Sequence, residues 1–286
     1  MAAATISVAV VTRNRPESLR RTLRSLRLQS RQPLEVLVSD DSDAGPAERT
    51  RSIAREFDCR YVPGPRRGLY ANRNAAALAV SGTHVRTMDD DHEFPERHWE
   101  RCEDAVAADG TAVWIIGEVI PSVPGTAPDE CPGELHPRGF SVPPRDADHT
   151  WAIADGASIY PVDLFRGGVL FAEAFRFGAS YLEFGSRLHR LGYRIRHLRG
   201  TYIVHHADFA NRSYDDETEL MAARVFATLS HSFRYQPTLV NRSLTVAQIA
   251  REVVRTGRPG ITAVHQGYRA FREQQRALDL DVAALR

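Results

Sequence analysis

The sequence predicts an α/β protein: a mostly parallel sheet flanked by helices, followed by a helical C-terminal extension. Three observations lead to this prediction. Short apolar, β-branched runs alternate with amphipathic segments through the first hundred or so residues. Several of these runs end in polar or acidic residues, as strands do where an α/β sheet binds its ligand. From residue 214 onward the chain shows helical patterns only.

The first half of the chain alternates regularly between strand and helix patterns. Residues 5–12 form a β-branched run typical of a buried parallel strand. A helix follows, since Leu19, Leu23 and Leu26 have helical spacing and Pro16 suits a helix start. Further strands are predicted at 33–41, 59–65 and 83–91, with helices at 47–57 and 68–82. Such alternation implies parallel strands joined by right-handed crossovers.

The second half is less regular. We expect a helix at 95–108, a strand at 112–120, a long loop at 121–149, an extended segment at 151–161, a helix within 179–195 and a strand or strand pair at 193–206. The chain then divides into a main domain (1–213, with halves 1–95 and 96–213) and a helical extension (214–286). The extension could pack on the main domain, cover an acceptor or form a homodimer.

Composition narrows the class of protein. The 286 residues carry a formal net charge of +1, which gives no reason to expect nucleic acid as a partner. The three cysteines match no zinc spacing or disulfide framework, so a reducing compartment is the simplest interpretation. Because no apolar run reaches about 18 residues, we expect no transmembrane helix and a cytoplasmic location, with peripheral membrane attachment left open.

Three polar clusters lie at predicted strand ends: Thr12–Asn14, Asp40–Asp41 and Asp89–Asp91. Carboxyl ends of parallel strands share one sheet edge, so these clusters should converge. The stretch TMDDDHEFP poses the sharpest question, because adjacent carboxylates repel unless water or a cation compensates them. Asp89 and Asp91 are two residues apart and should point the same way on an extended segment. This feature alone leaves a metal site and a solvated turn equally open.

Other polar residues admit two interpretations each. Asp40 suits a uracil or thymine imide or a ribose, but also an Asx-turn or helix cap. Arg73 suits a phosphate, but also an exposed helix surface. His205 or His206 could supply an imidazole to the metal, or form a hydrogen-bonded loop pair. The chain has no GxxxxGK[ST] and no GxGxxG, which leaves a metal-bridged diphosphate as the sensible way to hold a nucleotide.

These stretches resemble the nucleotide-sugar half of family 2 glycosyltransferases with the GT-A fold. The resemblance covers residues 5–95 well and 150–206 more loosely. Five features occur in the family's order: a first strand with T-x-N, a strand-ending DD-S, an R-N helix, a D-x-D, and a G-Y-R-I followed by histidine.

The resemblance implies roles for individual residues. It implies Mn²⁺ or Mg²⁺ as the cofactor and a nucleotide-diphospho-sugar as the donor. The implied nucleotide-sugar contacts are Thr12, Asn14, Asp40, Asp41, Arg73, Asp89, the variable middle residue Asp90, and Gly156. The implied metal ligands are Asp91, Asp89 and one of His205 and His206.

The resemblance is weakest at the catalytic base. The family places an acidic pair shortly before an R-L, but in SYLEFGSRL these places hold Ser180 and Tyr181. Glu183 matches a later acid and is the first candidate base, followed by Asp155. The alternative for Glu183 is an ion pair with Arg187 one helical turn away. If neither acid serves, the enzyme would retain configuration, use an unusual acceptor or be inactive.

The resulting functional prediction is a metal-dependent transferase of the hexosyltransferase type. It would move a sugar from a UDP- or dTDP-linked donor to a hydroxyl of a small-molecule or lipid-linked glycan acceptor, with inversion. One alternative is a non-catalytic or hydrolytic sugar-nucleotide-binding protein. Another is a nucleotidyltransferase of similar architecture, although TRNRPES lacks the glycines of a triphosphate-binding loop.

Overall fold

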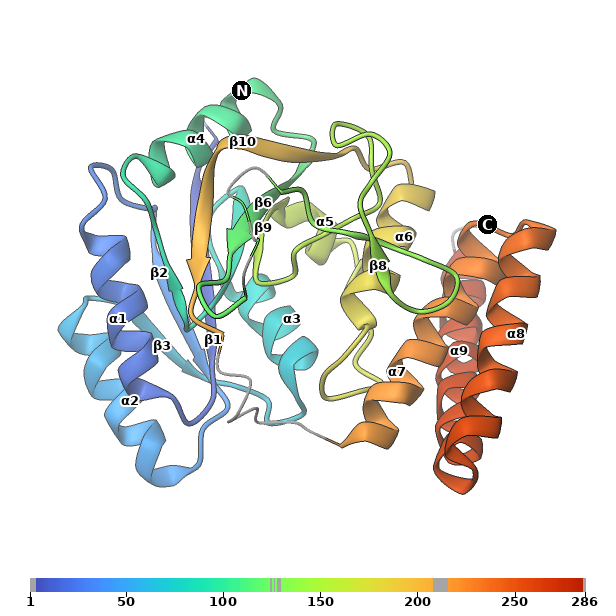
Figure 1. The fold of residues 1–286 in the computed structure, drawn as a ribbon. Helices are drawn as coiled ribbons and strands as arrows, with labels where there is room; N and C mark the ends of the chain where they lie inside the picture. Colours follow the sequence, from blue (N-terminus) through green and yellow to red (C-terminus); the bar gives the residue numbers. More distant parts are fainter. Residues whose placement is uncertain (1–3, 124, 126, 128–129, 208–215, 285–286) are drawn as a thin grey trace.

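The computed structural model describes residues 4–284 except 124, 126, 128–129 and 208–215, with side chains described through 275. It confirms the predicted α/β class and the helical C-terminal region (Figure 1). Eight strands form one sheet in the order β3-β2-β1-β4-β9-β6-β10-β5. These are β1 (Ile6–Thr12), β2 (Val36–Asp40), β3 (Arg60–Pro63), β4 (His84–Asp89), β5 (His92–Glu93), β6 (Val113–Val119), β9 (Ala157–Pro161) and β10 (Ile195–His205).

The half of the sheet formed by β1 to β4 is parallel, as expected. β1 lies between β2 and β4, and its register pairs Thr12 with Asp40 and Val11 with Asp89. The strand ends that carry the three polar clusters therefore lie at one edge, side by side. The helices between these strands are α1 (Pro16–Arg27), α2 (Ala44–Glu56) and α3 (Leu69–Ala79).

The other half of the sheet is mixed. β9 runs antiparallel between β4 and β6, whereas β10 runs parallel to β6. β10 is one long strand with an irregularity between Leu198 and Tyr202, so the predicted choice of strand or strand pair resolves to a single strand. The two-residue β5 pairs antiparallel to the end of β10 and sets His92 opposite His205. The sequence did not predict β5.

Two apolar cores cover the two faces of the sheet. One is formed mainly with α1 and α4 (His98–Ala108) and includes Trp99. The other lies under α3, α5 (Val162–Arg166) and α6 (Ser180–Arg190), with Tyr160, Phe171 and Phe184 packed ring against ring. The predicted loop at 121–149 holds only the short hairpin of β7 (Glu134–Leu135) and β8 (Ser141–Val142) among its described residues.

The C-terminal helices are α7 (Glu217–Ser230), the π-helix η1 (His231–Tyr235), α8 (Leu239–Thr256) and α9 (Arg258–Ala284). α7 and α9 pack together around Phe226, Ala263 and Phe175, and α8 lies on their outer side (Figure 1). The predicted boundary at 213–214 lies outside the described residues. Within the part of the chain that is described, no helix combines the length and apolar character needed to cross a membrane.

Glu183 ties this helical region to the sheet. Its carboxylate is fully buried on α6, accepts hydrogen bonds from Tyr235 Oη at 2.6 Å and Gln274 Nε2 at 3.1 Å, and pairs with Arg187 Nε at 3.1 Å. The i+4 ion pair with Arg187 thus exists, but in the interior and not on a helix surface. Three elements, α6, η1 and α9, meet at this one carboxylate.

We expect Glu183→Ala to lower the free energy of unfolding by about 3–5 kcal/mol, because it leaves Arg187 buried without its charge partner. Chemical denaturation monitored by circular dichroism measures the change. Glu17→Ala is the matched control: its side chain is 63% exposed and pairs with Arg49, so a change below about 1 kcal/mol is expected. A Glu183→Ala protein of normal stability but without turnover would instead restore Glu183 as the base.

Candidate functional site

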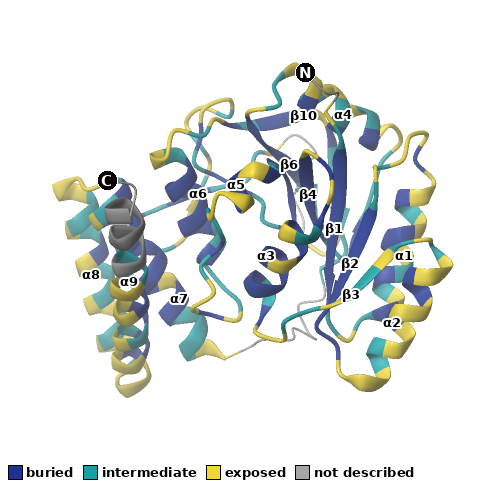
Figure 2. Cartoon of the chain, turned by 180° about the vertical axis from the view of Figure 1, so that it is seen from behind, coloured by how far each residue is buried: buried dark blue, intermediate teal, exposed yellow. Residues whose placement is uncertain are grey.

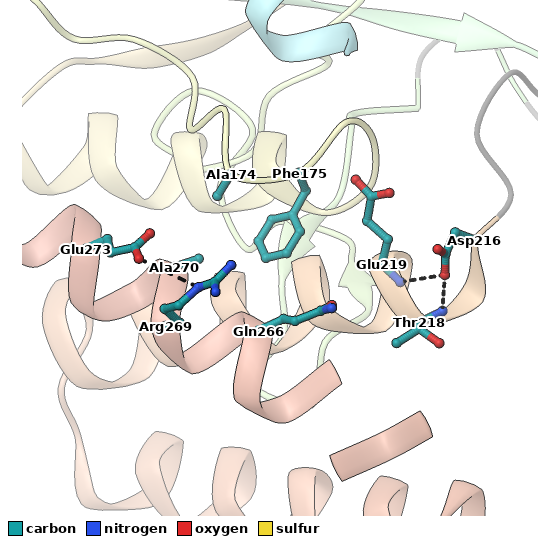
Figure 3. Close-up of a pocket in the computed structure, with 9 residues that line it drawn as sticks. All are labelled: Ala174, Phe175, Asp216, Thr218, Glu219, Gln266, Arg269, Ala270 and Glu273. Atoms are coloured by element: carbon teal, nitrogen blue, oxygen red, sulfur yellow. Dashed lines mark hydrogen bonds and ion pairs between the residues drawn. The ribbon is translucent and has the colours of Figure 1, made fainter. Parts of the chain in front are cut away.

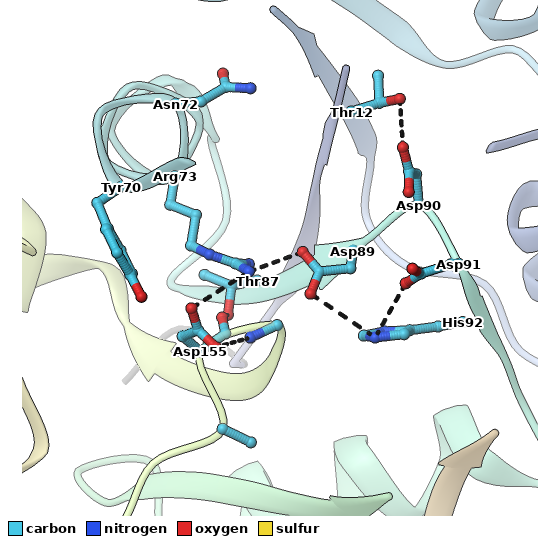
Figure 4. Close-up of polar contacts among 12 residues, drawn as sticks. Thr12, Tyr70, Asn72, Arg73, Thr87, Asp89, Asp90, Asp91, His92 and Asp155 are labelled. Atoms are coloured by element: carbon cyan, nitrogen blue, oxygen red, sulfur yellow. Dashed lines mark hydrogen bonds and ion pairs between the residues drawn. The ribbon is translucent and has the colours of Figure 1, made fainter. Parts of the chain in front are cut away.

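The three aspartates that follow β4 point in different directions (Figure 4). Asp90 turns away from the other two: it is fully buried, accepts a hydrogen bond from Thr12 Oγ1 at 2.6 Å and pairs with Arg15 at 2.6 Å. Asp89 and Asp91 both approach His92, at 4.0 and 3.8 Å. The repulsion expected between three adjacent carboxylates is therefore reduced, because Asp90 points away from Asp89 and Asp91.

Charge is compensated unequally across the segment. Burial and the neighbouring Asp91 together raise the pKa of Asp90 to about 7, against the opposing effect of Arg15. The pKa of Asp91 lies well below its usual range: burial opposes ionisation, but the hydrogen bond with His205, the nearby His92 and Arg15 outweigh it. Arg15 lies 2.9 Å from Asp91 and therefore forms ion pairs with both Asp90 and Asp91. Asp91 is the anionic centre of the segment.

Asp91, His92 and His205 form a candidate metal centre. One ligand atom from each residue lies within 4.8 Å of the others. The Nδ1 of His92 is buried and has no hydrogen-bond partner in the described structure. Burial lowers the pKa of His92 to about 4, which keeps its imidazole neutral. One carboxylate and two imidazoles suit Mn²⁺ better than Mg²⁺, which prefers oxygen ligands only.

Glu118, near the end of β6, contacts the histidine ligand candidate His205 on the ring nitrogen that faces away from Asp91. Its Oε2 lies 2.7 Å from Nδ1 of His205, while Nε2 of that ring lies 3.5 Å from Asp91 Oδ1. A carboxylate on the outer nitrogen of a histidine is the usual partner of a metal-binding imidazole. Both acids outweigh the effect of burial and raise the pKa of His205 to about 10.

A cavity of about 250 Å³ opens beside this centre. It brings together four predicted residues from three separate segments: Asp89, Asp155 with Gly156, and His205. The polar side chains that line it, with the glycine, are Asp89, His92, Glu118, Ser141, Asp155, Gly156, Tyr181 and His205. Ile153 and Ala157 supply apolar wall, and the hairpin residue Gly133 closes one side.

Arg73 holds the acidic floor of this cavity in place. It is 1% exposed, and its Nη2 donates to Asp89 Oδ1 at 2.7 Å and lies 3.5 Å from Asp155 (Figure 4). Its other guanidinium nitrogens have no described partner. Burial raises the pKa of Asp155, partly offset by Arg73. The expectation of an exposed helix arginine therefore does not apply to Arg73.

Gly156 leaves the space that Asp89 occupies. A Cβ at Gly156 would lie 2.1 Å from Asp89 Oδ2, while Arg73 fixes the other oxygen of that carboxylate. We expect Gly156→Ala to displace Asp89 and weaken donor binding roughly tenfold to a hundredfold. Calorimetric titration with a nucleotide sugar checks this. Gly45→Ala, where a Cβ meets nothing within 4 Å, should bind as the unmodified chain does; equal affinities for both variants would contradict this reading of Gly156.

The residues predicted to contact the nucleotide form a second group at and just after the ends of β1 and β2. Asp40 accepts from Tyr61 Oη at 3.1 Å and from the Ser42 amide, and Asp41 accepts from the Arg66 amide. Asn14 adopts a left-handed conformation (φ 59°) and bonds reciprocally with Asp43. The turn-stabilising role expected as the alternative for Asp40 is thus visible in its bond to Ser42.

Several predicted residues do not line the cavity, and three of them have their contacts elsewhere. Glu183 lies in the buried network described above, Asp90 faces Thr12, and His206 Nε2 lies 3.0 Å from Glu93. Sequence reasoning also missed site residues. His92 directly follows the D-x-D, Glu118 ends a predicted strand, and Arg15 follows T-x-N; each position is a signal that could have identified them.

A second cavity, of about 280 Å³, lies between α7 and α9 and the loop before α6 (Figure 3). Phe175, Glu219, Arg269 and Glu273 are among its lining residues. It contains none of the predicted site residues. The metal-type cluster and the converging strand ends therefore make the first cavity the candidate active site.

Comparison with known proteins agrees with this fold. The N-terminal part of TarS from S. aureus (1–349), solved with UDP-GlcNAc, matches with a TM-score of 0.59 at 15% identity, covering 96% of this chain and 92% of that one. GalNAc-T7, solved with UDP, GalNAc and Mn²⁺, matches with a TM-score of 0.69 at 15% identity, covering 95% and 55%. A longer TarS structure also matches, with a TM-score of 0.58 at 16% identity. That match covers 94% of this chain but only 54% of the longer TarS chain. No curated protein sequence matches the chain.

The fold of the chain is thus the one seen in these solved glycosyltransferases. The family model described as glycosyl transferase family 2 matches residues 7–166, more than half of the chain. The chain belongs to this family. The expected class of enzyme, a glycosyltransferase, is confirmed on this ground.

Proposed function

We propose that the protein transfers a sugar from a nucleotide-diphospho-sugar, UDP- or dTDP-linked, to a hydroxyl group of an acceptor, with the help of a divalent cation. The observation that carries this proposal is the single cavity in which Asp89, Asp155, Gly156 and His205 meet the cluster of Asp91 and His92. TarS has been solved with UDP and with UDP-GlcNAc, which supports a uridine donor. Family membership disfavours the nucleotidyltransferase alternative.

Asp91, His92 and His205 would hold the cation, with Asp89 as a further ligand or ribose contact. A bound cation would supply charge stabilisation for the departing diphosphate. The protein's own residues would position the ligands and bind the nucleoside. Arg73 fixes Asp89 and Asp155, Glu118 orients His205, and Thr12, Asn14, Asp40 and Asp41 surround the nucleoside.

Asp155 is the acid we propose as base, in place of Glu183. It lines the cavity, and burial raises its pKa toward a range suited to taking a proton from a hydroxyl. Glu183 does not line the cavity, and its buried carboxylate is already in contact with Tyr235, Gln274 and Arg187. A base opposite the leaving group corresponds to inversion of the anomeric centre, the outcome we propose for a hexosyl donor and a small-molecule or lipid-linked acceptor.

A thermal-shift screen of UDP- and dTDP-sugars, each with and without Mn²⁺, tests the proposal. A ligand that binds only the folded chain raises its melting temperature, and the rise should require both metal and nucleotide. Donor consumption with and without an acceptor mixture then separates transfer from hydrolysis. Stabilisation by no nucleotide sugar, with the metal present, would overturn the proposal.

The raised pKa of His205 predicts how metal binding depends on pH. Without metal, His205 is protonated below pH about 10, whereas a ligand imidazole must be neutral. Mn²⁺ should therefore release about one proton per ion, and its affinity should rise roughly tenfold per pH unit above neutrality. Isothermal titration in two buffers of different protonation enthalpy counts the protons. Mn²⁺ affinity that does not change with pH would contradict this ligand assignment.

A further inference from the structure

The helix α8 presents its apolar side outward. The exposed fractions are 81% for Leu239, 67% for Val240, 56% for Val246 and 86% for Val254. Only Thr245 of this helix is buried, and it bonds to Ser232 and to the carbonyl of Pro137. The helix packs on the protein through Thr245 and the partly buried Leu244, Ile249 and Val253, and it still leaves four large apolar residues to solvent, more than packing on the protein requires.

The exposed apolar residues form one continuous stripe. Leu239, Ser243, Val246, Ala250 and Val254 follow one another at spacings of three and four residues, which places them on one side of an α-helix. All five are exposed. Figure 2 shows α8 at the outer edge of the molecule with almost no buried surface along it. Such a stripe on the outer side of a helix marks an interaction surface.

The surroundings of the stripe are cationic. From Leu239 to Gln275 the helical pair α8–α9 carries six arginines and two glutamates, while the whole chain has a net charge of only +1. Both glutamates are already paired, Glu252 with Arg255 and Glu273 with Arg269. Arg251, Arg258 and Arg272 are exposed, and α9 adds the exposed Ile261 and Tyr268.

From these observations we propose that α8, with the adjoining side of α9, docks on an anionic lipid surface. Aliphatic residues flanked by arginines match the acyl boundary and the charged headgroups of such a membrane. A second copy of the chain is a less suitable partner for this surface, because the arginines of the two copies would lie opposite each other and repel. Two helices of 18 residues packed along one stripe would also cover less than the roughly 1,200 Å² of a stable interface. The proposal does not depend on the proposed function.

Co-sedimentation of the full chain with vesicles tests this docking. We expect binding to phosphatidylcholine vesicles that contain phosphatidylglycerol, little binding to phosphatidylcholine alone, and weaker binding at high salt. The triple variant Val240→Gln/Val246→Gln/Val254→Gln should bind at least tenfold more weakly, and so should Arg251→Gln/Arg258→Gln/Arg272→Gln. All six positions are exposed, so an unchanged melting temperature verifies folding.

The matched control is Leu28→Gln/Leu34→Gln, which alters leucines that are 78% and 55% exposed at the end of α1 and beyond. It should bind vesicles as the unmodified chain does. Absence of binding, equal binding to neutral vesicles, or an unaffected valine variant would overturn the proposal. So would a dimer in light scattering that the valine variant dissociates, because the stripe would then be covered by a second copy.

Discussion

Asp91→Ala should abolish metal binding and lower metal-dependent turnover about a thousandfold, the largest loss we expect from any single change. Asp91 supplies the only carboxylate oxygen of the cluster with His92 and His205, and its pKa lies well below the ordinary range. Its removal leaves two imidazoles and an Arg15 that has lost one of its two acidic partners and repels a cation. Titration with Mn²⁺, followed by electron paramagnetic resonance of the free ion, measures the loss directly.

The neighbouring acid provides the control for this experiment. Asp90→Asn changes a carboxylate one residue away that faces Thr12 and Arg15, so stability should change while Mn²⁺ affinity stays within a few-fold. Excess Mn²⁺ should not restore Asp91→Ala to full turnover. Turnover of Asp91→Ala within a few-fold of the unmodified chain would remove the metal from the proposed mechanism.

The parallel half of the fold and the convergence of its polar clusters follow from local patterns. Strand-helix alternation places the ends of β1, β2 and β4 at one edge, and the register of Thr12 with Asp40 is a direct consequence. The side-chain directions within the acidic stretch do not follow in this way. The prediction that Asp89 and Asp91 point the same way assumes an extended backbone through both residues, but β4 ends at Asp89. Both carboxylates nevertheless approach His92.

The parts that sequence reasoning missed depend on contacts between distant segments. His92 became a candidate ligand only because β5 pairs with the end of β10, and a two-residue strand has no periodicity to detect. Glu183 has an ordinary helical spacing to Arg187; its burial results from η1 and α9, some 50 and 90 residues later in the chain. A π-helix such as η1 also has no sequence pattern of its own.

Asp155→Asn should lower turnover roughly a hundredfold to ten-thousandfold while leaving donor and Mn²⁺ affinity nearly unchanged. The amide keeps the size of the side chain and can still lie beside Arg73, but it cannot accept the proton of the acceptor hydroxyl. In the unmodified chain, activity should fall as the pH drops through the raised pKa of Asp155, because the base becomes protonated. That acid limb should be missing from the residual activity of Asp155→Asn.

Glu118→Gln separates a base from a residue that acts through the metal. Glu118 also lines the cavity, yet it contacts His205, so its loss should weaken Mn²⁺ binding about tenfold to a hundredfold and be rescued by excess Mn²⁺. Asp155→Asn should not be rescued, since its defect lies in proton transfer. If the outcomes are reversed, with Glu118→Gln inactive at saturating metal and Asp155→Asn active, the base is Glu118. If both variants turn over at full rate with saturating Mn²⁺, no cavity carboxylate takes the proton, and a transfer that retains configuration becomes the better account of this site.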